Sequence, residues 1–275
     1  MPCSSKRLLR RLLLTALISL TVSGSSVHAG VIVFDAVTLQ NRPIYLKVLT
    51  KGRFFPAGGE RVRIEKEGVV LGRILTGGDG YGFFKTQLQS PGVHAITARS
   101  NGASATGTIL VVTPETPLLL MEIEVFSLRR LPREKNAEAA RDALQQLSKS
   151  YGLIYLVASF GLDGARSYIR STQFPPSVVI SYHGRKTFRR LKNRGLNLSV
   201  AIGTPKFVES AANAVERRFS FEKTSDGETV QNWNDLLSRL NGVNQRGTGA
   251  RGHREPVGET GTHRVGSIDG EPSTP

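Results

Sequence analysis

The first third of the chain alternates polar and apolar residues with a period of two. Short runs of this kind recur about every eight to twelve residues between clusters of Gly, Pro and Asn, a spacing typical of short strands joined by turns. The runs span residues 31–34, 44–48, 61–64, 69–71, 81–84, 94–98 and 108–112. Such alternation places every second side chain on one face of a sheet. We therefore predict a small all-β sandwich over residues 30–113.

From residue 118 the pattern changes to continuous apolar runs separated by segments of helical spacing. The runs span residues 118–126, 153–159, 177–181, 198–203 and 218–221. The first helical segment carries Ala140, Leu144, Leu147 and Tyr151 on one stripe, and Asn136 could cap it. The other helical stripes span residues 165–172, 185–194, 208–215 and 230–240. Repeated βα units predict a parallel sheet covered by helices, an α/β domain over residues 118–241.

Two segments connect or follow these predicted domains. Residues 114–117 begin and end with a proline, Pro114 and Pro117. Because each proline fixes its own φ angle, we predict a stiff, extended linker there. From Gly242 the chain consists mainly of Gly, Arg, Thr, Glu, Ser and Pro, with basic and acidic residues in balance. That composition predicts a disordered tail over residues 242–275.

The first 29 residues have the order of a secretory signal peptide. Four cations (Lys6, Arg7, Arg10 and Arg11) precede an apolar run, and small residues ending at Ala29 follow it. The run is shorter than the about 20 residues that span a bilayer, so we expect no transmembrane segment in the mature chain. We predict export, to the periplasm or out of the cell. A mitochondrial presequence stays an alternative, since the region is also rich in Arg and Ser.

Cysteine content and charge narrow the possible partners. The one cysteine, Cys3, lies inside the predicted signal peptide, which excludes a disulfide framework and Cys-based metal sites in the mature chain. Loss of the four N-terminal cations from a total of 37 would leave 33 basic and 22 acidic residues, a net charge of +11. A basic surface favours anionic surroundings.

The β region resembles bacterial immunoglobulin-like and carboxypeptidase-regulatory-like modules. Residues 75–84 form a Thr-Gly-Gly-Asp-Gly turn that leads into an aromatic strand, and Pro91-Gly92 precedes the next strand. Asp79 is then a turn residue rather than a calcium ligand, because no other acids cluster near it in the sequence. Modules of this kind are spacers or binding platforms.

Four segments of the α/β region stand in an order that resembles the haloacid dehalogenase (HAD) superfamily, in particular its lipin-like phosphatidate phosphatases. Two acids end the first strand, a serine ends the second, two cations open a helix, and Gly-Thr follows the fourth strand with an acid beyond it. These positions are Glu122, Glu124, Ser159, Arg185, Lys186, Thr204 and Glu209. The resemblance implies a Rossmann-like sheet, a phosphate contact at Ser159 and a phosphate-pairing amine at Lys186.

The catalytic positions depart from that family. Where it has an attacking Asp and an acid–base Asp, this chain has Glu122 and Glu124, and where it has a magnesium-binding Asp, this chain has Thr204 followed by Lys206. A displacement of about 1 Å in a reacting group can cost about 100-fold in rate. A hard divalent ion also prefers several oxygen ligands and is repelled by an ammonium group. We therefore predict no resident metal and a degenerate site.

Two functions follow from these residues. The first is a non-catalytic binding or interaction module of the cell envelope, a pseudophosphatase. The alternative is a magnesium-dependent phosphohydrolase in which Glu122, Glu124 and Glu209 gather the ion. Because Glu122 and Glu124 alternate along a strand, they point the same way only if the strand has ended. At least one should reach the open edge of the sheet, where Lys186 or Lys206 could pair with it in place of a metal.

The predicted helix at residues 185–194 carries six cations among ten residues. Phe188 and Leu191 share its inward face, so the charges form either a solvated surface or a docking surface for anionic lipid headgroups or envelope polymers. The cations are Arg185, Lys186, Arg189, Arg190, Lys192 and Arg194. Little aromatic interleaving and the predicted export argue against nucleic acid. Asp163 and His183 stand alone in the sequence and are expected in surface or turn positions.

Overall fold

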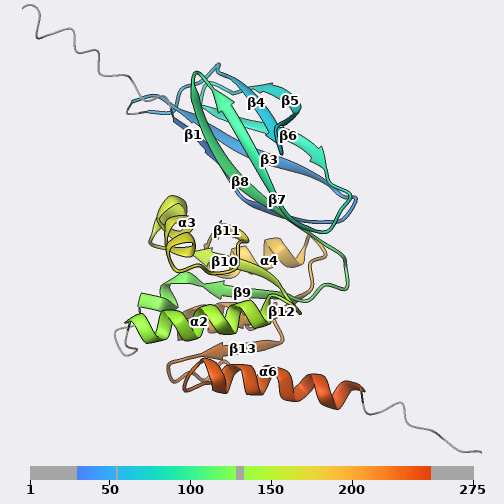
Figure 1. Ribbon diagram of the computed structural model, residues 1–275, viewed down its shortest axis with the longest axis vertical. Helices are drawn as coiled ribbons and strands as arrows, with labels where there is room; N and C mark the ends of the chain where they lie inside the picture. The colour runs from blue at the N-terminus through green and yellow to red at the C-terminus, as the bar shows by residue number, and fades with distance from the viewer. Residues whose placement is uncertain (1–29, 54, 128–132, 249–275) are drawn as a thin grey trace, which may run out of the picture. The chain divides into compact units, whose positions relative to one another are not determined.

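The computed structural model describes residues 30–53, 55–127 and 133–248 (Figure 1). Eight strands form the predicted sandwich: β1 (Gly30–Val33), β2 (Ala36–Leu39), β3 (Pro43–Lys51), β4 (Arg61–Lys66), β5 (Val69–Leu75), β6 (Tyr81–Gln87), β7 (Gly92–Ser100) and β8 (Ala103–Val112). One sheet has the order β1-β3-β6 and the other the order β2-β8-β7-β4-β5. The buried side chains of both inner faces, among them Leu46, Ile64 and Ile109, form the core of the sandwich.

The strand order identifies the sandwich as immunoglobulin-like. The first strand divides between the two sheets: β1 pairs with β3 antiparallel, and β2 then pairs with β8 parallel. The sheet that contains β7 and β8 also carries β4 and β5, as in the larger sheet of immunoglobulin variable domains. The sequence pattern missed β2 because Ala36–Leu39 follows β1 after only two residues.

The second sheet is parallel throughout, as predicted. Its strands are β9 (Leu118–Glu122), β10 (Gly152–Val157), β11 (Val178–Ser181), β12 (Leu198–Ile202), β13 (Arg217–Ser220) and β14 (Glu228–Thr229). The spatial order is β11-β10-β9-β12-β13-β14, which is the 3-2-1-4-5-6 order of doubly wound α/β sheets. In this order the direction of winding reverses between β9 and β12, and ligands of such sheets bind at the carboxyl ends of those two strands.

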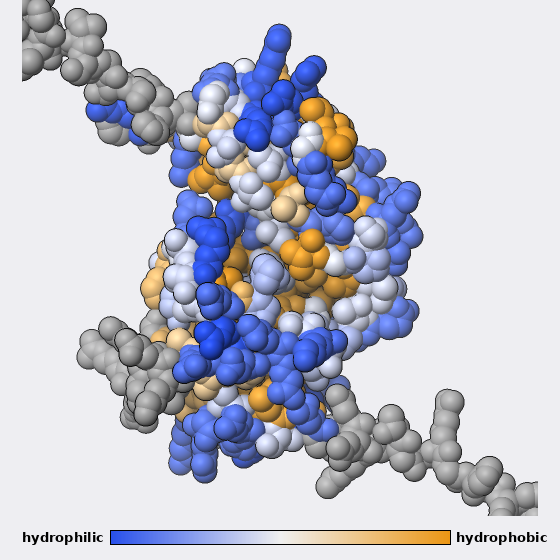
Figure 2. All heavy atoms as spheres, in the orientation of Figure 1, coloured by the Kyte–Doolittle hydropathy of each residue, from blue (hydrophilic) through white to orange (hydrophobic). Residues whose placement is uncertain are grey.

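A 3₁₀ helix and five α-helices accompany this sheet. They are η1 (Ile123–Ser127), α2 (Arg133–Leu147), α3 (Gly161–Ser171), α4 (Arg185–Lys192), α5 (Pro205–Ala211) and α6 (Trp233–Thr248). The exposed face of α2 is hydrophilic, and hydrophilic residues gather over it in Figure 2. Asn136 lies inside α2 rather than at its N-cap, and Tyr151 lies beyond the end of that helix. The last helix continues to Thr248, past the predicted boundary at residue 241, and residues 249–275 lie outside the described residues.

Besides its own core, the sandwich contributes side chains to the hydrophobic core of the parallel sheet. Buried Val37, Leu39, Leu110 and Val112 of β2 and β8 belong to the same cluster as Leu118, Leu120 and Ile154 of the parallel sheet. Both regions belong to one compact unit that ends at Leu237, and the chain from Ser238 forms a second unit. The linker is not extended, because the Thr116 N–H donates to the Thr113 carbonyl at 3.1 Å and closes a turn. The predicted extended linker is therefore a turn.

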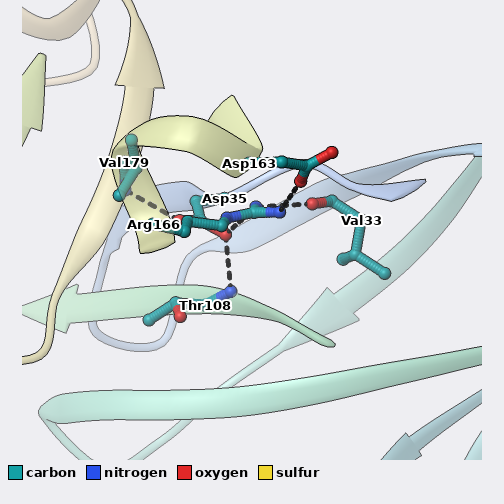
Figure 3. A network of polar contacts seen from close by, with 6 residues as sticks. All are labelled: Val33, Asp35, Thr108, Asp163, Arg166 and Val179. Carbon is teal, nitrogen blue, oxygen red and sulfur yellow. Dashed lines mark hydrogen bonds and ion pairs between the residues drawn. The ribbon is translucent and has the colours of Figure 1, made fainter. Parts of the chain in front are cut away.

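Asp35 fixes the sandwich to the edge of the parallel sheet (Figure 3). It lies between β1 and β2, where the first strand passes from one sheet to the other. Its Oδ1 accepts the Thr108 N–H of β8 at 2.8 Å, and its Oδ2 accepts the Val179 N–H of β11 at 2.7 Å. The Arg166 guanidinium of α3 also donates to Oδ1, and to the Val33 carbonyl. Because β11 is an edge strand, Asp35 satisfies a backbone N–H that a missing neighbouring strand would otherwise bond.

Because the Asp35 carboxylate is buried, the loss of any of its hydrogen-bond partners would destabilise the folded protein. The Asp35 side chain is 1% exposed, and desolvation raises the pKa of its carboxyl above the ordinary value although Arg166 opposes the shift. A buried charge is tolerated only when it is fully paired and hydrogen-bonded. The other acid near Arg166, Asp163, is 80% exposed and lies 3.7 Å from the guanidinium.

We predict that Asp35→Ala lowers the free energy of unfolding by about 3–5 kcal/mol, because it leaves Arg166 and two part-buried backbone N–H groups without this acceptor. Denaturant unfolding of the full chain measures this loss. The matched control is Asp163→Ala, which removes an exposed acid from the same arginine and should change stability by about 0.5 kcal/mol or less. Equal effects of the two variants would contradict the role given to Asp35.

Candidate functional site

The two glutamates at the carboxyl end of β9 both reach the open edge of the sheet. The strand ends at Glu122 and η1 begins at Ile123, so the alternation that would separate the two side chains stops between them. Val125 and Phe126 of η1 are buried, and the Phe126 ring stacks on Trp233 at 5.8 Å and packs against Phe174 at 4.8 Å. The aromatic contacts hold η1 in place, and with it the position of Glu124.

Glu122 bonds to the start of α5. Its Oε2 accepts the Thr204 N–H at 2.6 Å, and Thr204 is the N-cap residue of α5 with Pro205 following. The side chain is buried, and desolvation raises the pKa of the Glu122 carboxyl, with the charge of Glu124 adding to the shift and hydrogen bonds from Thr204 opposing it. Gly203 is needed here, because a Cβ at that position would lie 2.8 Å from Glu122 Oε2.

Glu124 bonds to the loop after β10. Its Oε1 accepts the backbone N–H of Ala158 at 2.8 Å and that of Ser159 at 2.6 Å. Two converging backbone N–H groups at the end of a strand form a site that favours an anion. The carboxylate of Glu124 fills it, whereas its second oxygen, Oε2, is buried and has no hydrogen-bond partner among the described residues.

The structure brings some of the predicted site residues together and separates others. Glu122, Glu124, Thr204 and the backbone of Ser159 meet at the edge between β10, β9 and β12. Lys186 and Lys206 are exposed, and the glutamates bond to backbone N–H groups rather than to these lysines, so the predicted pairing was wrong. Ser159 contributes its N–H, and its exposed side chain does not cap α3, whose N-cap residue is Phe160.

The alternative function would have Glu209 bind a magnesium ion with Glu122 and Glu124, but Glu209 pairs with an arginine instead. Its Oε1 accepts a hydrogen bond from the Arg185 guanidinium at 3.1 Å, in an ion pair exposed on both sides. Within the described residues no three His, Cys, Asp or Glu side chains come together to hold a metal ion. Thr204, a hydrogen-bond donor to Glu122, stands where a third acidic ligand would be needed, so the residues present do not fit a magnesium ion.

The cations of α4 divide between two sides of the helix, while Phe188 and Leu191 are buried against the sheet. Arg185, Lys186, Arg189 and Lys192, here called the basic surface, line a groove of about 430 Å³ beside Ser210 and Asn213 of the α5 region. Arg190 and the more distal Arg194 line a second hollow, shared with the sandwich.

Sequence reasoning missed three contributors to this edge. They are the backbone N–H groups of Ala158 and Thr204, and the close approach at Gly203. One signal was present: Thr204-Pro205 has the N-cap and N1 residues of a helix, which places free N–H groups beside the end of β12. His183 and Asp163 are exposed, as expected for surface positions, although Asp163 contacts Arg166.

Comparisons with known proteins identify no family for this chain. No family model matches the chain, and no curated protein matches it. Similar solved structures include the CARDB domain of a Pyrococcus furiosus protein, with 18% identity over 30% of this chain and 92% of that chain and a TM-score of 0.24. The IG27 protein domain has 8% identity over 33% of this chain and 99% of that chain, with a TM-score of 0.27.

The D00-D0 domain of intimin has 14% identity over 33% of this chain and 51% of that chain, with a TM-score of 0.26. At such TM-scores these likenesses carry no argument about this chain. The assignment of the sandwich rests on its strand pairing. No helix in the part of the chain that the structure describes is long and apolar enough to cross a membrane.

We predict that Glu122→Gln changes how stability depends on pH. A carboxyl whose pKa is raised by folding contributes stability that is complete below its unfolded pKa, about 4.3, and is lost as the pH rises through the folded value. The stability of the natural protein relative to Glu122→Gln should therefore fall as the pH rises above about 4.3, as measured by denaturant unfolding at several pH values.

Thr204→Val is the matched control for this pH dependence. It keeps the Glu122 carboxyl but removes the side-chain hydrogen bond that opposes the raised pKa, so it should make the loss of stability with rising pH steeper. A relative stability of the natural protein that increases with pH would contradict the raised pKa of Glu122.

Proposed function

We propose that this chain is an exported, non-catalytic binding protein of the cell envelope whose α/β domain derives from the HAD-like phosphatases. One observation carries the proposal: Glu122 and Glu124 already occupy the backbone N–H groups at the carboxyl ends of the strands. A phosphoryl group bound at this edge would need those donors. It would also meet two carboxyl groups at close range, and like charges repel.

The strand order supports this derivation. The order β11-β10-β9-β12-β13 with all strands parallel is compatible with the Rossmann-like sheet that the resemblance implies. The segment after β9 supports the loss of chemistry. In the first motif of that family, Gly-Thr follows the two Asp residues and lets the chain turn away, whereas here Val125-Phe126 stand at those positions in a 3₁₀ helix that Phe126 anchors.

The basic surface of α4 is the proposed contact with a partner. Of its four cations only Arg185 has a carboxylate partner within the described residues, namely Glu209. An excess of positive charge over a groove attracts an extended anion, and the attraction weakens as salt increases. The charge balance predicted for the mature chain has the same sign.

We favour an anionic polymer over a lipid surface as this partner. A helix that docks into a membrane interface inserts an apolar face between the headgroups. The apolar residues of α4, Phe188 and Leu191, are each 1% exposed and face the core of the domain. The basic surface can therefore offer charge but no apolar insertion, which suits a hydrated envelope polysaccharide that carries carboxylates or phosphates.

We predict that Lys186→Ala/Arg189→Ala weakens binding to polygalacturonate, a model anionic polysaccharide, by about tenfold or more, since each lost cation near a charged surface is worth about 1 kcal/mol. Arg42→Ala/Lys85→Ala removes the same charge from exposed positions of the sandwich and is the control. Equal losses in the two double variants would contradict a localised site. Binding only to vesicles of phosphatidylglycerol and phosphatidylcholine would favour lipid docking instead.

We also predict that magnesium produces no release of phosphate from p-nitrophenyl phosphate above the level of Glu122→Ala. The physical reason is that both carboxyl groups are engaged by backbone N–H groups and no third acid joins them in the described chain. Colorimetric assay of the full chain with and without magnesium measures this. Magnesium-dependent turnover that disappears in Glu122→Ala would establish the alternative, a Glu-based phosphohydrolase.

A further inference from the structure

A second basic site lies between the sandwich and the parallel sheet. It is a cleft of about 290 Å³ with walls from β3 on one side and from β11 and α4 on the other, here called the seam cleft. Its lining includes Lys47 and Tyr45 of β3, Phe34 beside β1, His183 before α4, and Arg190 and Arg194. A volume of this size is at the lower end of small-molecule sites, which hold about 300–1,000 Å³.

Among the described residues, the cations of the seam cleft have no carboxylate partners. The one acid in its lining, Asp35, uses both oxygens on Arg166, Thr108 and Val179. In the part of the chain that the structure describes, none of Lys47, Arg190 and Arg194 forms an ion pair with a carboxylate. The cleft therefore holds three permanent positive charges that its own residues do not neutralise.

Two of these charges are close enough to oppose each other. Partial burial and the charge of Arg190 lower the pKa of Arg194, whose guanidinium donates one weak hydrogen bond of 3.4 Å to the Val37 carbonyl. Arginine pairs bind the oxygens of phosphate groups by planar, parallel hydrogen bonds, and they do so better than lysines. A phosphate between them would relieve their repulsion.

The sandwich side of the seam cleft adds aromatic surface. The Lys47 amino group lies 4.0 Å from the centre of the Tyr81 ring and 4.7 Å from that of Phe34, which holds the amine beside the cleft. Tyr45 is 62% exposed and lines the cleft. Small-molecule sites combine apolar or aromatic walls with a few polar groups in this way.

We propose that the seam cleft binds an organic phosphate monoester, with the phosphate on Arg190 and Arg194 and a ring-shaped body against Tyr45 and Phe34. This site is independent of the basic surface, which lies on the other side of α4 and is proposed to bind a polymer. A sugar phosphate and a nucleoside monophosphate share the required chemistry. Measuring the affinity of both compounds shows which ring the cleft prefers.

Isothermal titration calorimetry of the full chain tests the proposal with glucose 1-phosphate, adenosine monophosphate, inorganic phosphate, glucose and adenosine. We expect at least one monoester to bind more tightly than inorganic phosphate, and the two unphosphorylated compounds not to bind. Arg190→Gln/Arg194→Gln should weaken the monoester by about tenfold or more, because charge-assisted hydrogen bonds are lost. The matched control, Arg185→Gln/Arg189→Gln, should leave this affinity unchanged and weaken polygalacturonate instead.

Several results would overturn the proposal. They are the absence of monoester binding at millimolar concentration, equal affinity for inorganic phosphate, and equal losses in the two double variants. If Arg190→Gln/Arg194→Gln does not fold, Lys47→Gln on the sandwich side serves as the second variant and should weaken the monoester several-fold. Loss of polymer binding with retained monoester binding would reject the proposed function alone.

Discussion

The buried carboxylate of Asp35 is the interaction on which the arrangement of this chain depends. It accepts hydrogen bonds from β8, from β11 and from α3, and so joins two sheets that have no strand pairing with each other. Beside it, apolar side chains of β2 and β8 complete the core of the parallel sheet. Because the polar and apolar contacts occur together, the immunoglobulin-like sandwich is a packed part of the unit rather than a spacer.

The carboxyl edge of the parallel sheet shows how a ligand position can be filled from within. Backbone N–H groups at the ends of strands and at the start of a helix attract anions. Here Glu122 and Glu124 supply the anions, and the longer glutamate side chains reach the loops after β12 and β10. Such an edge is stabilised by its own acids. The backbone N–H groups at this edge are therefore already bonded to the protein's own carboxyl groups.

Helix α4 contributes cations to two separate surfaces because of its helical periodicity. Its apolar residues face the sheet, which leaves the cations on both flanks, one toward α5 and one toward the sandwich. The sequence predicted the six cations as one group, since their number and spacing are visible in the chain. Their division into a basic surface and a seam cleft depends on what packs on each side of the helix, which no local pattern contains.

The sequence by itself determined the periodicity of two in the sandwich, the βα alternation that follows, and the residues at the ends of β9, β10 and β12. These features are local, because propensity and burial repeat along the chain. The tertiary structure decided that the first strand divides at Asp35, that Thr113–Pro117 turns back, and that β9 stops at Glu122. It also decided that the glutamates bond to backbone groups instead of to lysines. The reason is that a hydrogen bond between residues far apart in sequence depends on which surfaces pack together.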